Sequence, residues 1–504
     1  MYEIMNADEA IRLIRDGDCI CVNSFVGIEN PVELHEALYR RYQKMQSPTH
    51  LTIVSSAGFG VWDTEHNAEG YIRDGAVDRL ICGHFGAMMS TKKLVLEDRF
   101  EAYNLPLGCI SHAIRAQAGG LSGALSKVGL DIFVDPRLEG PGINRVSIDD
   151  SLVKHVEVDG EEFLYYKLPK ITIALIKGTA ADHKGNITFD DMFMSGDALS
   201  ICQAVKANRG KVIVQVDRLV DTPSRPRNAI IPGCLVDAIV VAEPQERNEA
   251  YTALTGSFEI PYEEWHIWSE KIDQASEKML KDNTIGKIIG RRAAKELRVD
   301  DIVNIGIGIP EMVSRYARKS GMLDMVTLTV ESGGIGGFPV SGEAFGAMIG
   351  AASVYMANQF DLYDNGGLDI CFMGALEVDQ YGNINAHRGP GAFAGIGGFA
   401  NITAKTPTVV FCMSFNAKGL TVSQKSGEIT IEKEGSVPKF VEHVNSISFS
   451  SKRAIENGQK VLYVTERCVF RLTPKGLKLI EVYPGIDAKR DILDQLPFEV
   501  EYKQ

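Results

Sequence analysis

The sequence predicts an α/β fold in which two related open domains, each built on a mostly parallel sheet, are fused in one chain of 504 residues. Three observations lead to this prediction. Short β-branched strands alternate with helical patterns, these strands are apolar along their whole length, and one strand–turn–helix pattern occurs in both halves of the chain. Apolar strands separated by helices are typical of parallel sheets that helices cover on both faces.

The expected strands follow one another at regular intervals. In the first half they lie in the segments 18–25, 50–58, 78–86, 170–178, 210–220 and 238–244, and in the second half in 301–308, 325–333, 368–375, 408–415 and 460–467. The first 18 residues instead have the pattern of a charged amphipathic helix, without the apolar core of a secretory signal.

A weak internal repeat divides the chain. Residues 18–31 and 301–311 share a strand, a glycine-containing turn and a proline that opens a helix, and residues 171–189 and 368–386 share a strand followed by Gly-Asn-Ile. We therefore expect an N-terminal domain over 1–260 and a C-terminal domain over 280–504, with a boundary near 255–280. The first half carries extra material, roughly 60–165. A cleft between two such halves is a common place for a ligand.

Composition excludes several classes of protein. The net charge of −13 argues against broad nucleic-acid binding, which needs a cationic face. No apolar run approaches the roughly 18 residues that span a membrane. The nine cysteines form no CxxC pair, which indicates buried, reduced thiols in a cytoplasmic protein and no structural metal site. Glycine is enriched, with 49 residues.

The first glycine-rich motif follows the strand at 301–308. Gly306 and Gly308 allow the backbone to approach a ligand, and Pro310 suits the first position of a helix whose N-terminus can face an anion. The third glycine of a dinucleotide-binding fingerprint is missing, which disfavours an NAD-dependent oxidoreductase. An ordinary strand-to-helix turn is the alternative interpretation.

The second motif is Glu331-Ser-Gly-Gly-Ile-Gly-Gly337, at the end of an apolar strand. Ligands of open α/β sheets bind at strand ends, and the glycines leave space around the carboxylate. With an ordinary pKa near 4.3, Glu331 would be mostly ionised at neutral pH and able to act as a nucleophile. A solvated loop residue is the alternative.

The third motif, residues 385–405, has five glycines in ten positions and is flanked by His387, Arg388 and Lys405. Such a loop can bind phosphate or an oxyanion through backbone N–H groups and nearby cations; the alternative is a flexible loop. The chain contains no P-loop, no HExxH and no GxSxG motif. His84, Cys371 and Cys412 fit packing roles better than catalytic ones.

Taken together, these motifs resemble the family I coenzyme A transferases, and among them the propionate and acetate CoA-transferases with both halves in one chain. The resemblance extends over nearly the whole length. Beyond the glycine motifs at 331–337 and 397–403, it rests on the segments 101–108, 133–137, 163–167, 361–369 and 465–470.

The resemblance implies a role for each motif. Glu331 would be the catalytic residue that forms a glutamyl–CoA thioester. Residues that line the CoA and oxyanion site would be Gly306, Ile307, Gly308, Ile309, Gly397, Gly398 and Lys405. Residues that face the acyl group or acid would be Val26, Gly27, Glu29 and Asn30. Glu29 and the loop 387–395 depart from the family pattern, which leaves the choice of acid open.

The implied function is reversible, ping-pong transfer of coenzyme A between a short-chain acyl-CoA and a free carboxylic acid. Coenzyme A would be a substrate, with no permanently bound cofactor and no metal, and the partners would be acyl-CoA, short acids and further copies of the chain in a dimer or tetramer. An acyl-CoA hydrolase on the same scaffold, a subunit that loads an acyl carrier, and a non-catalytic CoA-binding protein are the alternatives.

Overall fold

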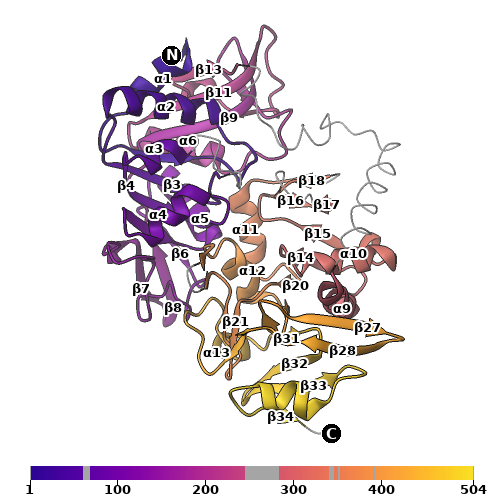
Figure 1. Cartoon of the computed structure of the whole chain (residues 1–504). Coiled ribbons are helices and arrows are strands. Elements are labelled where there is room, and N and C mark those ends of the chain that lie inside the picture. Colours follow the sequence, from indigo (N-terminus) through magenta and orange to yellow (C-terminus); the bar gives the residue numbers. More distant parts are fainter. Residues whose placement is uncertain are drawn as a thin grey trace. The chain divides into compact units, whose positions relative to one another are not determined.

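The computed structural model describes residues 2–60, 69–243, 283–339, 345–349, 352–389 and 392–502. By its contacts the chain divides into two units, whose elements can be followed by label and colour in Figure 1. Unit 1 comprises Met1–Glu259, Val330–Asp361 and Gly391–Gly398, and unit 2 comprises Ile260–Thr329, Leu362–Pro390 and Phe399–Gln504. The boundary expected near 255–280 lies outside the described residues.

Unit 1 is built on a sheet whose main path is parallel throughout. The strands follow in the order β1 (Glu3–Met5), β13 (Ala238–Val241), β11 (Lys211–Val220), β9 (Ile173–Asp182), β2 (Cys19–Val22), β3 (Leu51–Ser55), β4 (Val77–Cys82) and β5 (Glu101–Asn104). Every residue of β2 and β9 is buried, as expected for a sheet covered on both faces. The six strands predicted in this half are all present.

Helices follow most of these strands in unit 1. They are α2 (Val32–Met45), α3 (Gly70–Arg73), α4 (Met89–Leu96), α5 (Leu107–Ala118), α6 (Ala198–Ala207) and the first part of α11 (Met356–Asp364). Helix α5 packs against α6. The extra material of the first half includes a small antiparallel sheet of β6 (Ala124–Ser126), β8 (Glu161–Tyr166) and β7 (Val153–Val158). Two short strands, β10 (Ile187–Thr188) and β12 (Ala229–Ile231), extend antiparallel from β9.

The N-terminus differs from the helix predicted for the first 18 residues. Strand β1 pairs with β13 at one end of the sheet, and only then follow α1 (Ala7–Ala10) and a 3-10 turn (Ile11–Leu13). Helical periodicity is a local property, whereas β1 is stabilised by the backbone of a strand more than 200 residues away. The prediction of a continuous helix was wrong for this reason.

Unit 2 repeats the plan. Its strands follow in the order β15 (Thr327–Thr329), β14 (Ile302–Ile305), β20 (Ile370–Met373), β25 (Thr408–Cys412), β31 (Lys460–Val464), β32 (Cys468–Thr473), β33 (Gly476–Val482) and β34 (Glu501–Tyr502). The first five are mutually parallel, β31–β32–β33 are antiparallel, and β34 is parallel to β33. Its helices are α9 (Thr284–Ala293), α10 (Glu311–Lys319), α12 (Phe399–Lys405), α13 (Ser451–Glu456) and the end of α11.

Unit 2 also contains short strands outside its main sheet. They are β21 (Glu377–Asp379), β22 (Ile384–Asn385) and β30 (Phe440–Val441) in one sheet, β26 (Asn416–Ala417) with β29 (Val437–Pro438), the hairpin β27 (Thr421–Lys425) with β28 (Glu428–Lys433), and β23 (Arg388–Gly389).

The same turn occurs in both units and bears out the internal repeat. In unit 1 the carboxylate of Asp182 accepts the backbone N–H of Asn186 at 3.0 Å and its side-chain amide at 2.9 Å. In unit 2 the carboxylate of Asp379 accepts the backbone N–H of Asn383 at 2.9 Å and its side-chain amide at 3.0 Å. An aspartate whose side chain bonds to the backbone of its own turn strongly favours that turn conformation.

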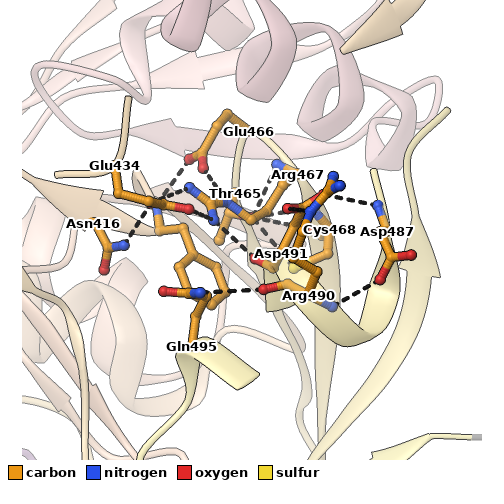
Figure 2. Close-up of polar contacts among 11 residues, drawn as sticks. Asn416, Glu434, Thr465, Glu466, Arg467, Cys468, Asp487, Arg490, Asp491 and Gln495 are labelled. Carbon is orange, nitrogen blue, oxygen red and sulfur yellow. Dashed lines mark hydrogen bonds and ion pairs between the residues drawn. The ribbon is translucent and has the colours of Figure 1, made fainter. Parts of the chain in front are cut away.

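A buried charge network stabilises unit 2 (Figure 2). The guanidinium of Arg467, which is fully buried, donates to Glu466 at 2.6 Å and to both oxygens of Glu434 at 2.8 and 3.0 Å. It also donates to the carbonyl of Asp491 at 2.8 Å and lies over the ring of Phe415 at 4.4 Å. Buried charges of this kind need partners to offset the loss of water.

None of the nine cysteines, all of which lie in the described part of the chain, forms a disulfide, and eight are buried. Cys234 is exposed, so the prediction of buried thiols was wrong there; it lies in a 3-10 turn (Gly233–Leu235) before β13. Over the described part of the chain, no helix is both long and apolar enough to cross a membrane.

Candidate active site

Glu331 lies in a tight turn of unit 1 that begins directly after β15. The N–H of Val330 bonds to the carbonyl of Gly334 at 3.0 Å, and β16 (Gly334–Ile335) then pairs with β19 (Ala352–Ser353). Gly333 has a φ of +121°, and a β-carbon there would stand 2.1 Å from the carbonyl oxygen of Val354. Glycine is therefore required at this position, and it fixes the turn that carries Glu331.

Buried side chains hold the segment that follows Glu331. Ser332 is fully buried and its hydroxyl donates to the carbonyl of Gly346. The ring of Phe193 and the sulfur of Met348 both pack against Gly334, where a β-carbon would stand 2.9 and 2.7 Å from them. Strands β17 (Phe338–Pro339) and β18 (Met348–Ile349) form a further antiparallel pair here.

Backbone hydrogen bonds connect the loop that follows β24 (Ala392–Phe393) to the end of β4. The N–H of Phe85 bonds to the carbonyl of Ala394, and the N–H of Gly397 bonds to the carbonyl of Gly83, both at 2.7 Å. The carbonyl of Gly397 in turn accepts the N–H of Leu107 at 2.9 Å. The ends of β4 and β5 therefore position this glycine loop, in the way that strand ends build sites in open sheets.

This loop brings Gly398 against Glu331. A β-carbon on Gly398 would stand 2.6 Å from the carboxyl carbon of Glu331, and the N–H of Gly398 donates to the carboxylate. Burial raises the pKa of Glu331 to about 7, although the Gly398 hydrogen bond acts in the opposite direction. The expectation of an ordinary pKa near 4.3 was wrong, because burial disfavours the charged form.

This arrangement makes Glu331 a candidate nucleophile. Glu331 is a half-buried residue, and burial leaves its carboxyl group poorly hydrated. With a pKa near 7, a substantial fraction is ionised at neutral pH. An N–H group that already points at this carboxylate can also stabilise negative charge that develops on it. Perturbed carboxylates in such surroundings are candidate catalytic groups.

The turn predicted to face the acid lies in unit 1 and is buried. Val26, Gly27, Glu29 and Asn30 are all buried, and Val26 and Glu29 have positive φ values of 55° and 58°. The Glu29 carboxylate accepts the N–H of Met194 at 2.7 Å. Glu29 thus anchors the segment whose Phe193 packs against Gly334.

The other predicted glycine turn lies in unit 2. The N–H of Gly306 bonds to the carbonyl of Phe372 at 2.8 Å, and the N–H of Gly308 bonds to the side chain of Glu311 at 2.7 Å. Ile307 and Gly308 are exposed, Ile309 is half-buried, and Pro310 directly precedes α10, as predicted.

The cations expected beside the third motif differ in character. Lys405 is exposed and ends α12 in unit 2, about 9 Å along the helix from its first residue. His387 is buried and contacts the hydroxyl of Ser448 at 2.7 Å. Burial lowers the pKa of His387 to about 3. His387 is therefore neutral at physiological pH, and its interpretation as a cation was wrong.

Several residues that shape the site were not predicted. Asn104, Phe193 and Met194 are buried and contact the segments that hold Glu331 and Gly398. None of the three carries a local sequence signal, because Asn104 ends the short strand Glu-Ala-Tyr-Asn, which is not an apolar run.

Comparison with known proteins identifies the family. The family model for coenzyme A transferases matches residues 4–242 and 287–490. The chain belongs to this family. It is 38% identical over 498 residues to acetate CoA-transferase YdiF of Escherichia coli (strain K12), covering 98% of this chain and 92% of that one. It is also 38% identical over 505 residues to caffeate CoA-transferase of Acetobacterium woodii, covering 99% and 94%.

Solved structures agree. YdiF from Escherichia coli O157:H7, both as apoenzyme and as a thioester complex with CoA, matches with a TM-score of 0.89 and 35% identity over 99% of this chain and 93% of that one. The predicted family and fold class are thereby confirmed. As a CoA-transferase, the protein is an enzyme that moves coenzyme A between an acyl-CoA and a carboxylic acid. The hydrolase alternative is not favoured.

Proposed function

We propose that this CoA-transferase exchanges coenzyme A between a short-chain acyl-CoA of the acetate or propionate type and a free carboxylic acid, through a covalent thioester of Glu331. The observation that carries the proposal is the burial of the Glu331 carboxylate against the N–H of Gly398. The thioester complex of YdiF with CoA supports a covalent route.

The reaction balances without ATP. The Glu331 carboxylate attacks the thioester carbonyl, the carbon–sulfur bond breaks, and CoA leaves as a thiolate, which yields a mixed anhydride. The thiolate then attacks the glutamyl carbonyl, the bond between that carbon and the bridging anhydride oxygen breaks, and the first acid leaves as its carboxylate with the bridging oxygen. An incoming carboxylate reverses both steps and departs as the new CoA ester. Covalent catalysis of this kind divides one difficult step into easier ones.

The other candidate site residues are given roles according to their positions in the structure. Gly398 would offer its N–H to the oxyanions formed on the glutamyl and acyl carbonyls; losing such a donor costs on the order of 3 kcal/mol in transition-state stabilisation. Gly397, whose own N–H is bonded to Gly83, would line the site with its backbone. The groups proposed to line CoA are Gly306, Ile307, Gly308, Ile309 and Lys405. Val26, Gly27, Glu29 and Asn30 would lie on the acid side, with Glu29 acting through the Met194 segment.

Overall sequence identity to the two relatives does not identify the carboxylic acid that this enzyme uses. The acetate and caffeate enzymes are each 38% identical to this chain, although caffeate is a much larger acid than acetate. We propose short acids, an enzyme without a permanently bound cofactor, a homo-oligomeric assembly and a cytoplasmic location.

The test compares Glu331→Gln with Glu69→Gln. Glu69 is also a buried carboxyl whose pKa is raised by burial, and it accepts the N–H of Thr91 at 2.7 Å. With acetyl-CoA and propionate, we expect the wild type and Glu69→Gln to form propionyl-CoA, and Glu331→Gln to bind CoA without turnover. Near-normal transfer by Glu331→Gln would refute the assignment. Release of free CoA without an acceptor acid would indicate a hydrolase, and CoA binding without turnover by the wild type would indicate a binding or carrier-loading protein.

A further inference from the structure

Asn104, the last residue of β5, is fully buried and uses both ends of its amide. Its oxygen accepts the N–H of Ile396 at 2.9 Å. Its nitrogen donates to the carbonyl oxygens of Cys82 at 2.9 Å and Gly83 at 2.8 Å. One side chain therefore joins the end of β4 to the loop that carries Gly398.

These contacts hold two consecutive residues of the loop in position. Asn104 holds Ile396, and Gly83 holds Gly397 through the 2.7 Å hydrogen bond from the Gly397 N–H. The next residue is Gly398, whose N–H donates to Glu331. Because Ile396 is bonded to Asn104 at the end of β5 and Gly397 to Gly83 at the end of β4, these contacts restrict where the Gly398 N–H can lie.

We propose that Asn104 is a positioning residue for catalysis, which holds the Ile396–Gly398 segment so that the N–H of Gly398 meets the carboxylate of Glu331. This inference rests on the proposed function of Glu331 as the nucleophile. Asn104 acts through the loop, since its own amide is occupied by Ile396, Cys82 and Gly83.

The amide suits this task for a chemical reason. It offers two N–H donors to two carbonyls and one oxygen to an N–H, and all three are satisfied inside the protein. Aspartate has the same shape but donates nothing, so Asn104→Asp would set a carboxylate oxygen against the carbonyls of Cys82 and Gly83. Alanine removes all three bonds without adding charge.

The test compares Asn104→Asp and Asn104→Ala with Asn208→Asp. Asn208 lies at the end of α6, where its amide donates to Gln117 at 2.6 Å and to the carbonyl of Ile171 at 3.0 Å, so it controls for loss of a similar bridge in the same unit. The measurements are the single-turnover rate of CoA attachment to Glu331 from acetyl-CoA, its pH dependence, CoA affinity and the midpoint of thermal unfolding.

We expect both Asn104 variants to slow attachment roughly 10- to 100-fold, with CoA affinity retained. Burial raises the pKa of Glu331 and the hydrogen bond from the Gly398 N–H lowers it. A loosened loop would weaken that hydrogen bond, so the midpoint of the pH profile should also move upward. Asn208→Asp should lose stability without either change.

Wild-type rate and midpoint in a folded Asn104→Asp or Asn104→Ala enzyme would overturn the inference. Rates are compared below the unfolding temperature of each variant, and Asn104→Ala serves if the aspartate variant does not fold. If the wild type itself attaches no CoA to Glu331, the proposed function fails; if the wild type does so and both Asn104 variants match it, only the inference about Asn104 fails.

Discussion

Gly398 lies so close to Glu331 that a β-carbon on it would stand 2.6 Å from the carboxyl carbon and 2.7 Å from Oε2. Only glycine leaves room for the carboxylate while its own N–H donates to it. The two residues come from separate parts of the chain, and the proposed active site is built around this contact between them.

Gly398→Ala should abolish most activity. The added methyl group would displace the Glu331 carboxylate and its hydrogen bond, so we expect a loss of at least about 100-fold in the rate of transfer. Steady-state transfer from acetyl-CoA to propionate measures this loss. Gly119→Ala is the control, because its φ is ordinary and the nearest atom to an added β-carbon is 3.5 Å away; equal losses in both variants would contradict the account.

The rate of CoA attachment should rise with pH through about 7. Burial raises the pKa of Glu331 to about 7, and only the ionised carboxylate attacks the thioester. Below that midpoint the rate should fall about tenfold per pH unit. A single-turnover pH profile measures the midpoint, and a midpoint near 4.5 would show that the carboxylate is not desolvated.

The same pKa shift predicts how Glu331→Gln affects stability. A carboxyl whose pKa is higher in the folded than in the unfolded protein destabilises the fold as it ionises. The wild type should therefore lose stability relative to Glu331→Gln between pH 4.5 and about 7, by on the order of 1–3 kcal/mol, and the difference should stay constant above that range. Urea unfolding of both proteins across this range measures it; a constant difference throughout would contradict the prediction.

Arg467→Ala should destabilise unit 2. The substitution leaves Glu466, which is fully buried, without the guanidinium that neutralises it (Figure 2). Removing one partner of a buried pair costs about 3–5 kcal/mol in the free energy of unfolding. Thermal unfolding measures the effect. Arg40→Ala, which removes only a surface ion pair with Asp8, should cost about 0–1 kcal/mol, and a similar cost for both would refute the role of the network.

Asp182→Asn should lower stability at neutral pH more than in acid. Backbone and side-chain hydrogen bonds hold the pKa of Asp182 well below its usual range, so its contribution is present above the unfolded pKa and disappears as the pH falls. We expect a loss of about 1–3 kcal/mol at pH 7. Urea unfolding at neutral and acidic pH separates the two, and a pH-independent loss would contradict the expected linkage.

Much of the fold follows from local patterns. The strands β2, β9, β14 and β20 are apolar runs between helices, and proline directly precedes α2 and α10 in both halves. These features depend on neighbours in the sequence, which is why they could be predicted. The edge strand β1 could not, because its partner β13 is distant in the chain.

The site was predictable only in part, for the same reason. Glu331 and Gly398 each stand in a glycine-rich motif that marks a close backbone approach. The function of Asn104 depends on a hydrogen bond to Ile396, 292 positions away. The pKa values of Glu331 and His387 follow from burial, which is a property of the packed structure and not of the local sequence.

Trapping the covalent intermediate is the most direct test of Glu331 as the nucleophile. The wild type is incubated with propionyl-CoA, reduced with borohydride and digested, and the modified peptide is mapped by mass spectrometry. We expect a single modified carboxyl, Glu331, in the wild type and in Glu69→Gln. An unmodified Glu331 in an enzyme that turns over propionyl-CoA, or modification of another carboxyl, would contradict it.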